Sequence, residues 1–334
     1  KANVAVGMAL RGGWRANVEA LYTKTLHNAV FRNLAVEQTG ENIDMVGGGS
    51  LGVVPKFKST TQEYSAIYYL DNTSKGYTYS LAATLSKDFS WGLSLMASYI
   101  FSHAYSVCDV PSTSSSSNWN RTYAVDLNNP SLTLSSYDVP HKLSLAVAYR
   151  KRYAKLVELG ATLVYQMNSG QRYSLCFGES VDFNGDGAYG STLMYIPTEA
   201  EMGRMQFADD SSQQKWNAMI EGDDYLRSHR GAFAERNTMQ TPMEHHLDLH
   251  FAHGFYFGKA TGRKLELSLD VMNFGNLLCR HWGTYYNVSG VRMQPVTITK
   301  LENGSPVYRF TDSKLSSDDM LSRWRMQLGV RVVF

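Results

Sequence analysis

The sequence contains no run of about 18 apolar residues, which excludes a transmembrane helix. It is also poor in charge, since 19% of its residues are charged and Lys+Arg 32 balances Asp+Glu 30. A balance this even lacks the basic surface of a nucleic-acid-binding protein, so we expect no nucleic-acid partner. Cysteine is scarce as well. Cys108, Cys176 and Cys279 do not have the spacing of metal ligands, and their odd number leaves one cysteine without a disulfide partner. We therefore expect free or weakly paired thiols.

Aromatic residues, in contrast, are abundant. They make up 12% of the chain, with 21 Tyr and 6 Trp. Both side chains suit positions that are apolar at one end and wet at the other, such as a membrane interface. The mean hydropathy of −0.29 resembles that of a soluble protein. A membrane barrel gives a similar average, because only alternate residues of its wall face lipid.

The dominant pattern is strict alternation of apolar and polar residues. Between Arg323 and Phe334 the apolar residues occupy every second position, with arginines between them. A strand places these arginines on one face, whereas a helix would scatter them. The same alternation recurs in eight further segments: Val4–Leu10, Trp14–Tyr22, Tyr77–Leu85, Leu93–Phe101, Leu143–Tyr149, Val157–Met167, Leu247–Phe257 and Leu265–Val271. About nine strands of roughly ten residues result, the length that a tilted strand needs to cross a bilayer.

The connections between these segments alternate in length. Short turns are expected at Arg11–Gly13, Asp88–Gly92, Arg152–Lys155 and Gly258–Arg263. Long polar connections are expected at Leu26–Gly76, Val107–Val139, Asn168–Met243 and Asn276–Leu321. Outer-membrane barrels have short periplasmic turns and long external loops, whereas a soluble β-sandwich would not sort its connections so cleanly. We therefore predict an all-β fold: a transmembrane antiparallel β-barrel segment of about nine strands that occupies residues 1–334 as one domain.

Strand parity predicts that the barrel is incomplete. The last strand follows a long connection and so ends at the periplasm, and a barrel with both termini there needs an even number of strands. An odd number leads us to expect the C-terminal part of a barrel whose first strands lie upstream.

Several motifs in order resemble the C-terminal half of a TonB-dependent outer-membrane receptor of the Bacteroidota type. The motifs are Asp71–Tyr77, Tyr137–His141, Ser169–Gln171, Asp182–Gly187 and Asp270–Leu278. The resemblance implies a location in the outer membrane of a Gram-negative cell. It also implies contact with membrane lipid, an N-terminal plug domain inside the barrel, and coupling to TonB through the missing N-terminal part.

Charged residues share one face of the predicted strands. They are Arg11, Arg15, Glu19, Arg150, Glu158, Asp248, Glu266, Asp270, Arg323, Arg325 and Arg331. A charge on the lipid face near the bilayer midplane would cost about 2–4 kcal/mol, so we expect these side chains to face the lumen. They would dock a plug domain or line the substrate path; the alternative is a solvated interior that needs no partner.

Two further groups of residues are candidate binding sites. Asp182, Asn184 and Asp186 have the D-x-N-x-D-G spacing of a calcium loop, although Leu193 replaces the carboxylate at the twelfth position. The alternative is a run of Asx turns. Aromatic residues of the predicted external loops would stack on a ligand, or else pack the loops or form a membrane-edge belt. They are Trp119, Tyr123, Trp282, Tyr285 and Tyr286.

No catalytic cluster stands out, so we expect a transporter and no enzyme. His246 and His250 share a strand face but lie about 13 Å apart, which argues against chelation by one strand. The leading hypothesis is the C-terminal barrel segment of a TonB-dependent active transporter that imports a large nutrient. The alternative is a passive porin, an adhesin or a surface-complex barrel whose loops bind a protein partner.

Overall fold

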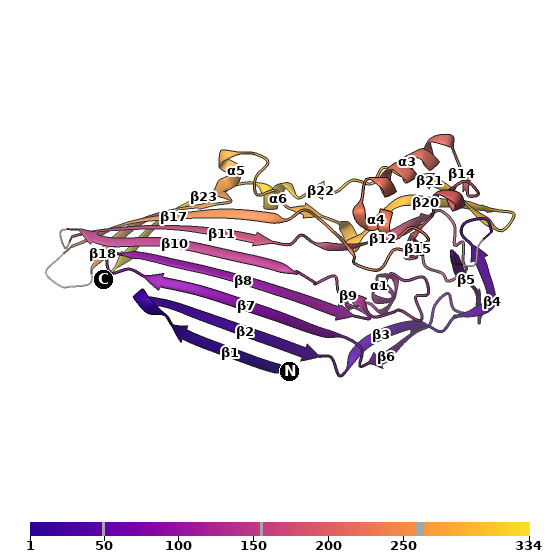
Figure 1. Ribbon diagram of the computed structural model, residues 1–334, viewed down its shortest axis with the longest axis horizontal. Helices are drawn as coiled ribbons and strands as arrows, with labels where there is room; N and C mark the ends of the chain where they lie inside the picture. The colour runs from indigo at the N-terminus through magenta and orange to yellow at the C-terminus, as the bar shows by residue number, and fades with distance from the viewer. Residues whose placement is uncertain (49–50, 154–155, 258–262) are drawn as a thin grey trace.

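The main sheet is antiparallel and follows chain order through nine long strands. The computed structural model describes residues 1–48, 51–153, 156–257 and 263–334. The nine strands are β1 (Ala2–Ala9), β2 (Trp14–Lys24), β7 (Tyr77–Asp88), β8 (Leu93–Ser106), β10 (His141–Tyr153), β11 (Val157–Asn168), β17 (Glu244–Tyr256), β18 (Lys264–Met272) and β23 (Arg325–Val333). They lie side by side along the long axis of the molecule (Figure 1). Each of the nine segments predicted from alternation is one of these strands, so that prediction is confirmed.

The sheet has one apolar face and one polar face, because the register brings like residues together across strands. Leu145 of β10 lies opposite Ala97 of β8 and Tyr165 of β11. The preceding residue, Ser144, lies opposite Ser98 and Gln166. Leu267 and Val330 of the apolar face are 44% and 72% exposed. An apolar surface that continues over nine strands marks a membrane or protein interface.

Short connections join the strands at one end of the sheet. The 3₁₀ turn η1 (Arg11–Gly13) joins β1 to β2. Between β7 and β8, the Phe89 N–H donates to the Leu93 carbonyl at 2.7 Å. Gly92 ends this turn with φ +106°, and a Cβ there would lie 2.2 Å from the Arg150 carbonyl oxygen, so only glycine fits. The two other predicted turns fall partly outside the described residues, at 154–155 and 258–262.

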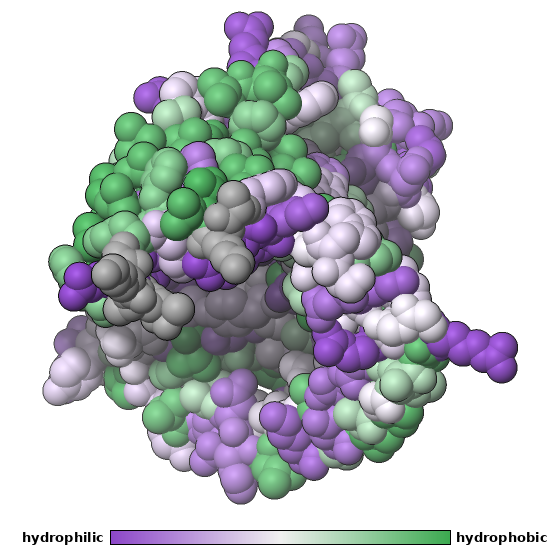
Figure 2. All heavy atoms as spheres, turned by 90° about the vertical axis from the view of Figure 1, so that its left-hand side faces the viewer, coloured by the Kyte–Doolittle hydropathy of each residue, from purple (hydrophilic) through white to green (hydrophobic). Residues whose placement is uncertain are grey.

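Figure 2 looks onto this end of the molecule. Hydrophobic side chains gather on one side of the rim, and the middle of the end is hollowed. Leu145 and Leu267 of the apolar face, for example, follow Ser144 and Glu266 of the opposite face. The arrangement is that of a wall with an apolar outer surface and a polar interior.

The long connections fold together at the opposite end of the sheet into what we call the loop unit. It contains a second sheet in the order β14-β21-β20-β12-β16. These strands are β12 (Arg172–Glu179), β14 (Gln206–Phe207), β16 (Met239–Gln240), β20 (Arg292–Glu302) and β21 (Ser305–Phe310). The helices α2 (Glu199–Met202), α3 (Asp210–Glu221) and α4 (Asp224–Ser228) belong to the same unit.

A hydrophobic core holds the loop unit together. Trp216 of α3 is fully buried, and its ring lies 5.3 Å from that of Tyr308 in β21 and 6.2 Å from that of Phe177 in β12. Aromatic pairs at these distances add about 0.5–1.5 kcal/mol each beyond their burial. The long connections, expected to be polar loops, contain the largest cluster of buried hydrophobic side chains among the described residues.

The remaining short elements lie in the connections between the nine strands. They are β3 (Asn28–Asn33), β4 (Val36–Asp44), β5 (Val53–Ser59), β6 (Tyr68–Thr73), α1 (Ser115–Asn120), β9 (Thr133–Leu134), β13 (Tyr195–Ile196), β15 (Ala232–Phe233), α5 (Phe274–Leu278), β19 (Tyr286–Asn287), η2 (Ser289–Val291), β22 (Ser316–Ser317) and α6 (Asp319–Ser322). None of the helices in the described part of the chain is both long and apolar enough to cross a membrane.

Candidate functional site

The polar face of the main sheet carries most of the predicted lumen residues. Register places nine of them on it: Arg15, Glu19, Arg150, Glu158, Asp248, Glu266, Asp270, Arg325 and Arg331. Glu266, for example, lies opposite both Gly254 and Arg331. The other two lie outside the strands. Arg11 is in the turn η1, and Arg323 follows α6 and donates to Asp319 at 3.0 Å.

The charges on this face pair with one another across strands. Lys264 donates to Glu158 at 2.8 Å and to Glu266 at 2.5 Å. Arg150 lies 3.8 Å from Glu158, and His250 contacts Asp270 at 2.6 Å. Mutual pairing lets a water-filled interior carry these charges without another partner. The polar face therefore fits a solvated lumen by itself, and contact with a plug is not required to explain it.

A cavity of about 650 Å³ lies where the polar face meets the loop unit, and we call it the vestibule. Its wall includes Lys142, Asn168 and Glu244, which stand opposite one another on β10, β11 and β17. Tyr285 lines it from the connection between α5 and β19. Burial, with a smaller contribution from Glu244, raises the pKa of the Tyr285 hydroxyl, which stays a neutral hydrogen-bonding group. The vestibule thus combines a cation, a carboxyl group, an amide and an aromatic ring.

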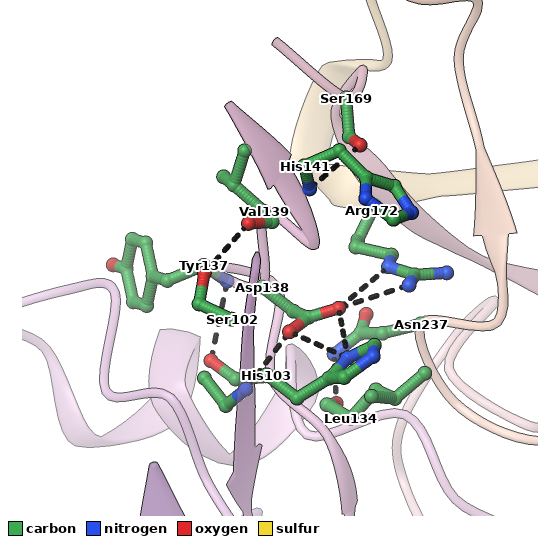
Figure 3. A network of polar contacts seen from close by, with 12 residues as sticks. Ser102, His103, Leu134, Tyr137, Asp138, Val139, His141, Ser169, Arg172 and Asn237 are labelled. Atoms are coloured by element: carbon green, nitrogen blue, oxygen red, sulfur yellow. Dashed lines mark hydrogen bonds and ion pairs between the residues drawn. The ribbon is translucent and has the colours of Figure 1, made fainter. Parts of the chain in front are cut away.

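A buried ion pair fixes the loop unit to the strands beside the vestibule (Figure 3). The Asp138 carboxylate is fully buried and accepts hydrogen bonds from Arg172 Nε at 3.1 Å and Nη2 at 2.9 Å. It also accepts from the backbone N–H of Ala104 at 2.8 Å, and the His103 Nδ1 lies 3.2 Å away. Figure 3 shows Arg172 and His103 converging on this carboxylate, whereas Tyr137 points away. Asp138 therefore joins β8, the start of β10 and β12 at one point.

Sequence reasoning did not single out this pair. Asp138 belongs to the Tyr137–His141 motif that carried the family resemblance, but Arg172 lies 34 residues later. Hydrophobic periodicity cannot reveal an ion pair between residues so far apart in the chain. The Tyr137–His141 motif was the one feature of the sequence that pointed to this region.

The five aromatic residues predicted to bind a ligand separate into two groups. Trp119 is 1% exposed and its Nε1–H donates to Asn128 at 3.0 Å; Tyr123 is 2% exposed and its hydroxyl donates to the Gly290 carbonyl. Burial raises the pKa of Tyr123 to about 12. Neither ring is exposed for stacking in this structure, because both are packed inside the loop unit, although Tyr123 borders another cavity. The other three, Trp282, Tyr285 and Tyr286, line cavities.

The D-x-N-x-D-G segment forms a succession of Asx turns. The Asp182 carboxylate accepts from the N–H groups of Gly185 at 2.8 Å and Gly187 at 3.0 Å. Asp186 accepts from the Ala188 N–H at 2.7 Å and from the Asn184 side-chain amide at 3.0 Å. Across the described residues, His, Cys, Asp and Glu side chains form no group of three or more able to hold a metal ion. The geometry fits the Asx-turn alternative.

Burial changes the titration of two carboxyl groups near this segment. It raises the pKa of Glu179 to about 8, with repulsion from Asp186 adding to the effect. It also raises the pKa of Asp186 to about 6. Both groups lie in the loop unit, so this region favours their neutral forms.

Aromatic residues gather near both ends of the apolar face. Near the loop unit the rings of Tyr77 and Tyr105 lie 4.7 Å apart, and the Tyr165 hydroxyl lies 2.8 Å from His245 Nδ1. At the other end, the rings of Trp91 and Tyr149 lie 6.0 Å apart. Strand β2 spans the two groups, with Trp14 at one end and Tyr22 at the other. A strand covers this eight-residue step in about 27 Å, or roughly 20 Å across a bilayer when tilted, close to the apolar band of an outer-membrane barrel.

The comparison with protein families agrees with this architecture. No curated protein matches the chain. A family model described as an outer membrane beta barrel domain matches residues 3–278. This range holds the strands from β1 to β18 and the part of the loop unit that precedes residue 279, but not β20, β21 or the last strand, β23. Because the match covers more than half of the sequence, the chain belongs to the outer membrane β-barrel family.

Proposed function

We propose that the chain forms part of the wall and the external entrance of an active importer of the TonB-dependent receptor type. The observation that carries the proposal is the vestibule, which lies between the polar face and the loop unit and offers Lys142, Glu244 and Tyr285 to a polar solute. The ordered motifs that resemble TonB-dependent receptors, among them Tyr137–His141, support TonB as the source of the energy for import. The vestibule would hold the nutrient before it enters the lumen.

The compact loop unit supports an importer over an open pore. Its aromatic core around Trp216 fixes the loops over the end of the sheet, so the entrance has a defined shape. A fixed entrance with a mixed polar and aromatic lining suits capture of one solute class. A general porin needs only an open lumen.

Two measurements on the protein purified from outer membranes distinguish the importer from a passive porin. In planar lipid bilayers with potassium chloride, an importer closed by its plug gives no steady conductance, and it binds the C-terminal domain of TonB in a pull-down assay. Steady open channels together with no binding of TonB would contradict the proposal and favour the porin.

Nutrient uptake tests the role of the vestibule. A strain without the gene is complemented with the parent chain, with Glu244→Gln or with Glu302→Gln, and grown on a panel of candidate nutrients. We expect slower growth only for Glu244→Gln, because Glu302 is exposed at the end of β20 and does not belong to the vestibule lining. Equal growth of all three complemented strains on every nutrient that requires the gene would contradict this role.

A further inference from the structure

A second cavity, of about 530 Å³, lies on the lipid-facing side of the wall, and we call it the rim groove. Its strand side includes Tyr165, His245 and Leu247 of the apolar face, and His246 of the opposite face also borders it. Its other side is formed by the connection after α5, including Trp282 and Tyr286. The rim groove is distinct from the vestibule, because the adjacent residues Tyr285 and Tyr286 line different cavities.

The floor of the rim groove is apolar. A Cβ at Gly275 would lie 3.8 Å from the Cβ of Leu247, so α5 packs directly on the apolar face of β17. Trp282 remains 57% exposed beside this contact, and Met243 remains 48% exposed. The indole ring of Trp282 and the thioether of Met243 are therefore not covered by other parts of the protein, on a surface that faces lipid.

The edge of the rim groove is cationic or neutral. His281 lines it, and the neighbouring Arg280 lies against it, with Nε 3.1 Å from the His281 Nε2. His245 stands at the strand side, with its Nδ1 2.8 Å from the Tyr165 hydroxyl. Among the described residues that line the cavity, none is an aspartate or glutamate. An apolar floor beside an arginine and histidines is complementary to an acyl chain that carries an anionic headgroup.

The position of the rim groove along the strands indicates which leaflet of the membrane it faces. The rim groove lies at the aromatic belt nearest the loop unit, where Tyr165 and His245 are paired. Long connections of outer-membrane barrels are external, so this belt lies at the headgroups of the outer leaflet. A lipid there can place its chain on Leu247 and its headgroup beside Arg280.

We propose that the rim groove binds a phosphorylated, acylated lipid of the outer leaflet. One acyl chain lies between Leu247 and Trp282, and a phosphate oxygen accepts hydrogen bonds from Arg280 and His281. The site is independent of transport, so its failure would leave the proposed importer intact. A protein partner on the same surface is the competing occupant.

Native mass spectrometry of the full chain in detergent tests the proposal, with bisphosphorylated lipid A as the probe and zwitterionic phosphatidylethanolamine as the comparison. The variants are Trp282→Ala and the double variant Arg280→Gln/His281→Gln. The matched control is Trp91→Ala, which removes a tryptophan of similar exposure, 53%, from the opposite belt. We expect preferential binding of lipid A, about tenfold weaker in both groove variants, the equivalent of one lost contact of about 1.4 kcal/mol, and unchanged in the control.

Fluorescence quenching by brominated acyl chains gives a second readout that does not rely on affinity. The tryptophan fluorescence of the parent minus that of Trp282→Phe isolates the emission of Trp282. Quenching of this difference signal by brominated chains reports contact between Trp282 and the lipid chains. Strong quenching of this difference signal supports the proposal. Equal binding of both lipids, unchanged lipid A binding in both groove variants, or retention of a protein partner that excludes lipid A would overturn it.

Discussion

The ion pair between Asp138 and Arg172 should be a main attachment of the loop unit to the strands. Replacing Asp138 with alanine removes two hydrogen bonds from the guanidinium and one from the Ala104 N–H. The Arg172 side chain is 11% exposed, so it would keep a buried charge with no carboxylate against it. Breaking such a pair from one side costs about 3–5 kcal/mol.

The cost should be local, because the ladder between β8 and β10 does not depend on this carboxylate. We expect faster proteolysis and faster hydrogen exchange in the loop unit of Asp138→Ala, while the strands keep their protection. The double variant Asp138→Ala/Arg172→Leu should recover part of the loss, since it also removes the unpaired charge. Asp88→Ala is the matched control, because Asp88 pairs with Arg15 on the surface, where both side chains are more than half exposed.

Two results would refute this reasoning. One is loop protection in Asp138→Ala equal to that in Asp88→Ala. The other is a double variant that loses as much stability as the single variants Asp138→Ala and Arg172→Leu lose together, which would show no coupling between the partners.

Three further predictions concern the loop unit and the two faces. Because the folded pKa of Glu179 is raised to about 8, its protonated form is favoured by the fold, so stability should fall as pH rises from about 4.5 to 8. Glu179→Gln should flatten that fall in denaturation curves; an unchanged pH profile would contradict the assignment. Leu267→Arg should destabilise the folded chain in lipid by about 2–4 kcal/mol, whereas Ser268→Arg on the polar face should cost little; equal costs would contradict the facing. Trp119→Ala should cost about 3–5 kcal/mol in unfolding free energy and Trp282→Ala far less, and similar costs would contradict the burial of Trp119.

The nine strands of the main sheet were predictable from sequence because their signal is local. Each wall strand must present alternate residues to lipid and to water, so the pattern is written into every segment, as in Leu143–Tyr149. The same alternation placed charges such as Glu266 on the polar face. Alternation does not mark where a strand begins or ends, and Arg11 and Arg323 lie just beyond the strand ends.

The loop unit was not predictable in the same way. β12 and β20 pair in parallel although more than a hundred residues separate them, and pairing at that range leaves no periodic signal. The burial of Trp119 likewise depends on Asn128 and Tyr68, which reach it from separate segments. An exposed aromatic residue and a buried one look alike in a polar loop sequence, so Trp119 and Trp282 were assigned the same role.

The central claim is that the apolar face contacts lipid and the polar face contacts water. Spin labels placed one at a time from Leu143 to Tyr149 in β10, in a background without the three cysteines, test it directly in lipid vesicles. We predict high collision rates with oxygen at Leu143, Leu145, Val147 and Tyr149, and high collision rates with a water-soluble nickel chelate at the residues between them. Accessibility that lacks this two-residue period, or that has the opposite phase, would contradict the account.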